Sequence, residues 1–286
     1  DKNIISQIVS YHEGPERIKA EIAKYDSVIV GDIPAHERNY IIKYCFGQNI
    51  RTYSVPKISD ILLRSSVELN LFDSPLLLSR NNQGLQIEQE IMKRIIDIVG
   101  SLIGIVITIP IFLIVGICIK MTDGGPVIYQ QTRLTKNGKK FQIYKFRTMV
   151  QNAEADGKAR LASEGDPRIL PIGRVLRATR LDELPQIYNI LKGDMSIVGP
   201  RPERPELAAE LEKEIPEFSF RLQVKAGLTG YAQVYGKYNT TPYDKLKLDL
   251  TYIRNYSVLE DLKLIIMTPK IMLMKESTEG VKEEQK

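Results

Sequence analysis

The sequence predicts two parts of different fold class. These are an α/β module over residues 1–80 and a membrane-associated α+β domain over residues 122–274, joined to a membrane helix at 93–121. Three observations predict this arrangement. Strand and helix patterns alternate in the first part, an uncharged run extends from Ile98 to Ile119, and two strand-like segments follow it, joined by Asn137-Gly138. Alternation is typical of parallel α/β layers, and the uncharged run is long enough as a helix to cross a hydrocarbon core of about 30 Å.

Composition restricts the chemistry. With 43% hydrophobic and 26% charged residues the chain is foldable, and a net charge of +5 suits an anionic partner such as nucleic acid, a lipid surface or a phosphorylated substrate. Cys45 and Cys118 lie far apart, which favours free thiols in a reducing compartment. With His12 and His36 as the only histidines, a zinc site or a Ser/His/Asp triad is disfavoured, and any metal is expected to be a hard cation such as magnesium.

The first 80 residues are expected to form part of a doubly wound, Rossmann-like layer with parallel strands. The segments 3–11, 26–32 and 50–55 have strand patterns, and 15–25, 35–48 and 57–65 have helix patterns. A glycine-rich phosphate loop is absent, so a regulatory or oligomerisation role is favoured over dinucleotide binding. The polar stretch 81–92 is predicted to be a linker.

The apolar run favours a membrane segment over a buried helix of a soluble domain, because globular helices of this length rarely lack a polar face. Pro110 lies in mid-run and removes one backbone hydrogen bond, while Thr108 can satisfy a freed carbonyl. Basic residues flank both ends, whereas a spanning helix usually carries its positive charge on one side. A spanning helix and a re-entrant helix therefore both remain open on these grounds.

The segment 127–149 is predicted to be a β-hairpin, because Asn-Gly between alternating apolar residues is a strong turn signal. Its lysines and arginines alternate with aromatic residues, a pattern that can also bind nucleic acid by stacking. Because the segment directly follows a membrane helix, contact with lipid headgroups or a phosphate-bearing substrate is favoured. Lys145 and Arg147 are the candidate phosphate-binding residues.

Two adjacent carboxylates, Asp182 and Glu183, lie among arginines. Taken alone, the pair is typical of a helix N-terminus, with Asp182 capping a helix that ends at Gly193. Arginines and a helix N-terminus also favour phosphate, so the carboxylates could share a divalent cation with it, or Asp182 could attack phosphorus. The proline-rich loop 199–205 that follows is expected to hold Arg201 and Arg204 in place at low entropic cost.

Several motifs together resemble the bacterial sugar transferases, also called monotopic phosphoglycosyl transferases. They are "KRIIDIVGS", "GGPVIYQQTRLTKNGKKFQIYKFRTM", "GDPRILPIGRVLRATRLDELPQIYNILKGDMSIVGPRPE", "KAGLTGYAQVYGK" and "LDLTYIRNYSVLEDLKLI". The resemblance covers residues 90–274. The N-terminal third is similar to the Rossmann-like extension of longer family members, whose upstream transmembrane helices would be missing here.

The resemblance implies a reaction and residue roles. Such enzymes move a sugar phosphate from a UDP-sugar to polyprenyl (undecaprenyl) phosphate at the cytoplasmic membrane face, release UMP and begin the assembly of exopolysaccharide, capsule, O-antigen or glycoprotein glycans. Asp182 matches the nucleophile that forms a covalent phosphosugar intermediate, and Glu183 matches a residue that helps to hold Mg²⁺. Arg177 and Arg201 match positions that line the active site.

The resemblance also implies a membrane helix that enters and leaves one leaflet by breaking at Pro110. The preceding Ile109 stands where many members carry Ser, and Ala226 stands where proline is usual. Membrane lipids are expected partners at the inner membrane, nucleic acid is not, and a homodimer is compatible with the additional module. A membrane-anchored nucleic-acid binder and a non-enzymatic scaffold of glycan assembly are the alternatives. The segments 206–215 and 256–273 are predicted helices, and 275–286 a disordered tail.

Overall fold

A computed structural model describes residues 7–64, 66–71, 74–79, 85–151, 166–237 and 239–272. Its contacts divide the chain into two compact units, residues 1–64 and 65–286. The predicted tail at 275–286 lies outside the described residues. The predicted membrane segment 93–121 lies within one helix of the second unit.

The first unit alternates helices and strands. Its elements are α1 (Pro15–Ile22), β1 (Ser27–Val30), α2 (Ala35–Gly47), β2 (Arg51–Ser54) and α3 (Ile58–Leu63), after a short 3₁₀ turn, η1 (Tyr11–Glu13). β1 and β2 pair in parallel, with Ser27 opposite Arg51, which confirms the predicted α/β pairing. The predicted strand 3–11 is wrong over its described residues, since 7–10 have no regular structure and η1 begins at Tyr11.

The hydrophobic core of the first unit is formed by apolar side chains of α1, β1 and α2. Ile18 and Ile22 of α1 pack with Val30 of β1 and with Ile41 and Cys45 of α2. The two α1 positions are four residues apart, so they lie on one helix face, as an amphipathic helix over a sheet requires. Cys45 is a free, fully buried thiol and serves as an apolar core residue.

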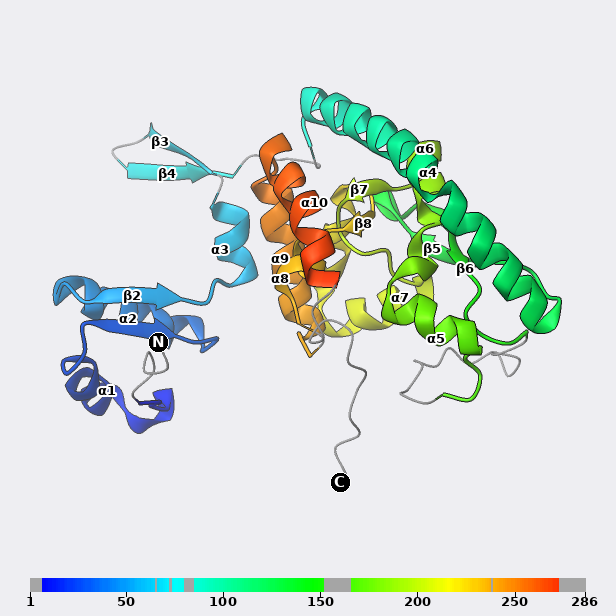
Figure 1. The fold of residues 1–286 in the computed structure, drawn as a ribbon. Coiled ribbons are helices and arrows are strands. Elements are labelled where there is room, and N and C mark those ends of the chain that lie inside the picture. The colour runs from blue at the N-terminus through cyan, green and yellow to red at the C-terminus, as the bar shows by residue number, and fades with distance from the viewer. Residues whose placement is uncertain are drawn as a thin grey trace. The chain divides into compact units, whose positions relative to one another are not determined.

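The second unit begins with an antiparallel hairpin of β3 (Val67–Leu71) and β4 (Ser74–Leu78). The long helix α4 (Ile87–Asp123) follows and begins earlier than the predicted start at residue 93. Figure 1 shows α4 as a single long helix along one side of the strands and helices that follow it in the second unit. It packs against α6 (Gln186–Lys192), β7 (Ser196–Val198) and α10 (Val258–Met272).

Among the described residues, α4 is the one helix long and apolar enough to cross a membrane. One of its faces is buried against the domain, and the other exposes large apolar side chains such as Val106 and Ile107. Pro110 lies inside a helix that is continuous from Ile87 to Asp123, so the predicted break does not interrupt it. The Thr108 hydroxyl donates to the Gly104 carbonyl at 2.7 Å. The buried face carries, in order, Lys93, Asp97, Ser101, Thr108, Val115 and Ile119.

The predicted β-hairpin is confirmed. β5 (Ile128–Leu134) and β6 (Lys140–Phe146) pair antiparallel, with Tyr129 opposite Lys145. Asn137 has φ 58° and Gly138 has φ 72° in the connecting turn, the left-handed conformation that Asn and Gly tolerate best. The inward side chains of β6 alternate along the strand, which places Lys145 on the same face as the buried Phe141 and Ile143.

The remaining elements of the second unit are mostly short. They are α5 (Pro171–Ala178), η3 (Leu181–Glu183), α6, β7, α7 (Pro205–Glu214), η4 (Pro216–Gln223), β8 (Gly227–Thr229), α8 (Tyr231–Tyr235), α9 (Pro242–Arg254) and α10. Among them, α6, η3 and α7 pack against the hairpin of β5 and β6. The predicted helices at 206–215 and 256–273 are confirmed by α7 and by the described part of α10. One core contains Phe141, Ile190 and Met195, and a second joins Ile119 of α4 to Phe146 and other residues. The second core fixes the end of α4 beside β6.

Candidate active site

Glu183 is the centre of the candidate site. It lies at the end of the short turn η3, is 8% exposed, and accepts hydrogen bonds from two cations. Its Oε1 is 2.7 Å from Nζ of Lys145 in β6 and 2.7 Å from Nη2 of Arg201 in the loop after β7. Three segments far apart in the sequence therefore meet at one carboxylate.

The charges in this cluster are strongly coupled. Burial alone would raise the pKa of Glu183, but the charges and hydrogen bonds of Arg201 and Lys145 outweigh it and hold that pKa well below its usual value. The charge of Glu183 in turn raises the pKa of Arg201, against the effect of burial. Burial lowers the pKa of Lys145, and Glu183 opposes this change. Glu183 is thus ionised at neutral pH and compensates part of the positive charge around it.

Asp182 has a different environment from its neighbour. Its side chain is half-buried, and none of the described residues donates a hydrogen bond to its carboxylate. Burial raises the pKa of Asp182, while the charge of Lys145 opposes that shift and the charge of Glu183 adds to it. Arg177 and Arg201 also act on it through their charges. Among the described residues Asp182 therefore has no hydrogen-bond donor and lies among cations, an arrangement compatible with a nucleophile toward phosphorus.

The predicted capping role of Asp182 is wrong. α6 begins at Gln186 with Pro185 as its N-cap and has no side-chain cap, while Asp182 belongs to the separate turn η3. Arg180 follows α5 and has a left-handed backbone conformation (φ 57°, ψ 14°). This conformation changes the direction of the chain, and η3 begins at the next residue. The predicted helix end is confirmed, since α6 is terminated by Gly193 in the left-handed conformation.

Arg177 lies in the last turn of α5 and is held by the hairpin. Its Nε donates to Oγ1 of Thr148 at 2.9 Å, just beyond β6. Gly173 permits this approach, because a Cβ at that position would lie 2.2 Å from the Thr148 carbonyl oxygen. Arg174 also belongs to α5, whereas Arg180 lies beyond the end of this helix at Ala178.

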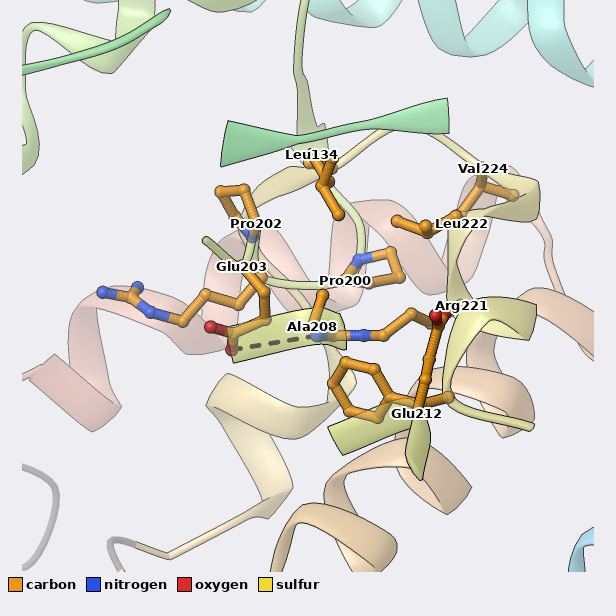
Figure 2. A pocket seen from close by; sticks show the side chains of 12 residues that line it. Leu134, Pro200, Pro202, Glu203, Ala208, Glu212, Arg221, Leu222 and Val224 are labelled. Atoms are coloured by element: carbon orange, nitrogen blue, oxygen red, sulfur yellow. Dashed lines mark ion pairs between the residues drawn. The ribbon is translucent and has the colours of Figure 1, made fainter. Parts of the chain in front are cut away.

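The loop that carries Arg201 is fixed by a second charged cluster. Arg133 Nη1 donates to the Pro202 carbonyl at 3.1 Å, and the Glu203 carboxylate lies 3.8 Å from both Arg133 and Arg221. Figure 2 shows Glu203 and Arg221 facing each other in a small pocket that is also lined by Leu134, Pro200 and Pro202. Arg221 is in turn 2.7 Å from the buried carboxylate of Asp249. This cluster holds the loop, so Arg201 can point to Glu183.

Arg147, one of the predicted phosphate-binding residues, is engaged elsewhere. Arg147 is 5% exposed, and its guanidinium pairs with Asp123 at the end of α4 (2.6 Å) and with the Pro126 carbonyl (2.6 Å). The structure therefore does not bring it to Glu183. Arg204 is the N-cap residue of α7 and lies near Arg133, whose pKa its charge helps to lower after the larger effect of burial.

Asp182 and Glu183 are the candidate ligands for a magnesium ion. No group of three or more His, Cys, Asp and Glu side chains in the described ranges is placed to hold a metal. Magnesium commonly binds through one or two carboxylates together with substrate phosphates, and the adjacent Asp182 and Glu183 supply such hard oxygen donors. The pair therefore fits a magnesium ion held mainly by a phosphorylated ligand.

Sequence reasoning missed several residues of this site. Thr148, Arg133 and Glu203 position Arg177 and the Arg201 loop, and Asp123 binds Arg147. Thr148 and Arg133 are distant in sequence from their partners and carry no local signal. Glu203 could have been found, because it lies within the arginine and proline-rich loop that was already singled out.

The sequence profile of the bacterial sugar transferase family matches residues 88–275. The UDP-N-acetylgalactosamine-undecaprenyl-phosphate N-acetylgalactosaminephosphotransferase of Aeromonas hydrophila is 35% identical over 87% of this chain and 59% of its own length. The undecaprenyl-phosphate galactose phosphotransferase of Salmonella typhimurium is 36% identical over 78% and 49% of the two chains. The UDP-glucose:undecaprenyl-phosphate glucose-1-phosphate transferase of Caulobacter vibrioides is 37% identical over 64% and 70%.

The chain spans about half the length of the longer relatives that it matches. The matched region contains α4, the Asp182-Glu183 pair and the Arg201 loop. Since the family profile covers well over half of the sequence, the chain belongs to the bacterial sugar transferase family.

Proposed function

We propose that this protein transfers a sugar-1-phosphate from a UDP-sugar to polyprenyl phosphate and releases UMP. The observation that carries the proposal is the contrast between two adjacent carboxylates. Glu183 is held by Lys145 and Arg201, while Asp182 has no hydrogen-bond donor among the described residues and lies in the field of the same cations. The names of the relatives, which join UDP-sugars with undecaprenyl phosphate, supply the two substrate classes.

The proposed reaction has two displacement steps. A carboxylate oxygen of Asp182 forms a bond to the β-phosphorus of the UDP-sugar, and the bond from that phosphorus to the bridging oxygen breaks, so that UMP leaves with the electron pair. A phosphate oxygen of polyprenyl phosphate then bonds to the same phosphorus, and the Asp182 carboxylate is released. This order lets two bulky substrates use one site in turn, and ping-pong kinetics follow.

The cations around Asp182 suit these steps. Lys145, Arg177 and Arg201 lower the pKa of Asp182 through their charges, which offsets part of the effect of burial, and the same charges favour anionic oxygens on phosphorus. Asp182 and Glu183 would hold magnesium, which supplies further neutralisation of the pyrophosphate when bound. The task of the chain's own residues is to orient the pyrophosphate and to keep Asp182 ionised.

We further propose that α4 enters and leaves the same membrane leaflet and that the catalytic domain lies on the cytoplasmic face of the inner membrane. Both ends of α4 contact the one catalytic unit. Near its start, Glu90 pairs with Lys136 and Arg94 donates to the Ile190 carbonyl at 2.8 Å. At its end, Asp123 pairs with Arg147. A folded polar domain lies on one side of a bilayer, so these contacts support a helix that does not cross it.

The topology has a direct test. In a chain whose Cys45 and Cys118 are replaced by Ser, Gln86→Cys and Lys139→Cys are introduced separately and labelled with a membrane-impermeant maleimide. Both positions are exposed and lie on opposite sides of the apolar segment in the sequence. Labelling of both in inverted vesicles and of neither in right-side-out vesicles is expected. Labelling from opposite faces would instead establish a spanning helix.

The catalytic proposal is tested with the purified protein, polyprenyl phosphate and a panel of UDP-sugars, by measuring UMP release. Asp182→Asn should abolish release and the covalent adduct that forms with labelled donor. Asp244→Asn removes the same charge from a half-exposed side chain in the first turn of α9 and should retain activity. Turnover by Asp182→Asn at the wild-type rate would refute the nucleophile assignment, and no release by the wild-type protein with any UDP-sugar would refute the function.

A further inference from the structure

A buried carboxylate on the apolar helix α4 has no part in the proposed reaction. Asp97 is 2% exposed and accepts two hydrogen bonds, one from Oγ of Ser196 (2.9 Å) and one from the backbone N–H of Ile197 (2.8 Å). These two donors are the first residues of β7. A carboxylate in an apolar helix is costly unless its hydrogen bonds are satisfied, and here strand β7 satisfies them.

β7 leads directly to the Arg201 loop. It ends at Val198, and Gly199 and Pro200 connect it to Arg201. The loop's start is held by β8 through hydrogen bonds from Gly199 N–H to the Thr229 carbonyl and from Gly227 N–H to the Pro200 carbonyl. A Cβ on Gly199 would lie 2.4 Å from the Lys225 carbonyl oxygen, so the backbone at Gly199 packs directly against the backbone at Lys225. A shift of β7 would therefore be passed on to Arg201.

A second buried group holds the same end of α4. Lys93 Nζ is 2.7 Å from Asp261 in α10 and 2.9 Å from the hydroxyl of Tyr252 in α9. The Tyr252 hydroxyl also lies 3.4 Å from the Val198 carbonyl oxygen in β7. β7 is thus contacted along its length by polar groups that depend on where α4 lies against the domain.

We infer that Asp97 is a positioning residue. Through its hydrogen bonds to β7, it makes the position of Arg201 against Glu183 depend on how α4 packs on the domain. The inference rests on the proposed function for its kinetic consequence. Packing alone would be served by an apolar side chain, and a buried polar group is weak evidence of a stabilising role. The contacts of Asp97 with the strand that leads to Arg201 give it a task that an apolar residue cannot perform.

The first test uses hydrogen exchange and needs no activity. Both hydrogen bonds end on Oδ1 of Asp97, so Asp97→Asn can keep them while it removes the charge, and Asp97→Leu removes both while the size and the apolar character of the helix are kept. Amide exchange in a peptide covering residues 196–204 should become clearly faster in Asp97→Leu and stay closer to the wild type in Asp97→Asn. Leu250→Ala is the control, because Leu250 is 1% exposed in α9 and its loss leaves a cavity without removing a hydrogen bond to β7.

The second test is the comparison of kcat with KM for the UDP-sugar. Arg201 donates to Glu183 at 2.7 Å, and a displaced loop would take its guanidinium away from this position beside the reacting carboxylate. We expect Asp97→Leu to lower kcat about tenfold with little change in KM, and Asp97→Asn to restore most of the rate, since small misplacements at a reacting centre cost that much or more. Leu250→Ala should leave kcat close to the wild-type value.

The outcomes separate the inference from the function. Unchanged exchange in 196–204, or a kcat of Asp97→Leu equal to that of the wild type, would overturn the positioning role and leave the proposed function intact. If neither Asp97 variant folds, Ser196→Ala removes one donor from the same contact and should give the same changes at smaller size. Absence of UMP release by the wild-type protein would refute the function instead, and the exchange experiment would still decide whether Asp97 holds β7.

Discussion

Lys145 Nζ and Glu183 Oε1 lie 2.7 Å apart, and this contact joins strand β6 to the turn that carries Asp182. Arg201 binds the same carboxylate from the loop after β7. Glu183 therefore organises the cations, while its neighbour Asp182 is left without a hydrogen-bond donor among the described residues. The different environments of the two carboxylates favour different roles, a pattern often seen in active sites.

In Glu183→Gln, the acid limb of the plot of kcat for UMP release against pH should move to lower pH. The maximal kcat should fall at the same time. The negative charge of Glu183 contributes to the raised pKa of Asp182, and the substitution removes that charge while Lys145 and Arg201 remain. A nucleophile with a lower pKa is ionised at lower pH. The measurement is kcat for UMP release against pH, with Glu210→Gln on the exposed face of α7 as a control that leaves the limb in place. A shift to higher pH would contradict the charge coupling described here.

Asp182→Asn should raise the thermal unfolding temperature at neutral pH. The pKa of Asp182 is raised in the fold, chiefly by burial, so its ionised form destabilises the protein once the pH is above the unfolded value. The amide removes this penalty and abolishes the reaction, as expected for a residue kept for function. Each 1 kcal/mol gained corresponds to roughly 2–4 °C in a domain of this size.

Glu183→Gln is the matched comparison for this stability effect. The pKa of Glu183 is lowered in the fold, so its contribution to stability is present above its unfolded pKa and is lost as the pH falls through the folded value. At neutral pH the substitution should therefore lower the unfolding temperature. Equal shifts of the same sign in the two variants would show that the two carboxylates do not differ in environment.

Local sequence signals predicted much of the fold but not its long-range contacts. The Asn137-Gly138 turn, the helix end at Gly193 and the parallel pairing of β1 with β2 follow from patterns within a few residues. The capping role of Asp182 failed because the left-handed Arg180 inserts a separate turn before α6, and a non-glycine residue in that conformation has no reliable sequence signal.

The candidate site was predictable only in part for the same reason. Asp182, Glu183, Lys145 and Arg201 were expected as one site, and the structure brings the last three into direct contact. The place of Arg147 depends on a pairing with Asp123 across the end of α4, which charge patterns cannot distinguish from phosphate binding. A basic residue beside a membrane helix can either pair with a carboxylate of the protein or bind phosphate. Only the three-dimensional contacts distinguish these two roles.

Arg147→Met tests this distinction. Arg147 is buried and paired with the partly exposed Asp123, so its loss should destabilise the protein by about 2 kcal/mol, below the range for fully buried pairs. The KM for the UDP-sugar, measured on the folded fraction, should stay the same, because the guanidinium is occupied at the end of α4. A raised KM with an unchanged unfolding temperature would restore Arg147 as a phosphate-binding residue.

Gly173→Ala should impair both stability and rate. Gly173 is buried in α5, and an added Cβ would lie 2.2 Å from the backbone carbonyl oxygen of Thr148, which cannot rotate away. α5 would have to move away from Thr148, whose hydroxyl holds Arg177, and overpacking of this kind costs about 1–3 kcal/mol. The measurements are the unfolding temperature and kcat for UMP release.

Gly116→Ala is the control within the same unit. Its added Cβ would lie 3.7 Å from the Val127 side chain, which is an ordinary contact, and alanine in a helix interior is favoured over glycine by about 0.5–1 kcal/mol. This variant should therefore be at least as stable as the wild type and fully active. If Gly173→Ala behaved like Gly116→Ala, α5 would not depend on a close approach to Thr148, and the placement of Arg177 beside Asp182 would need another cause.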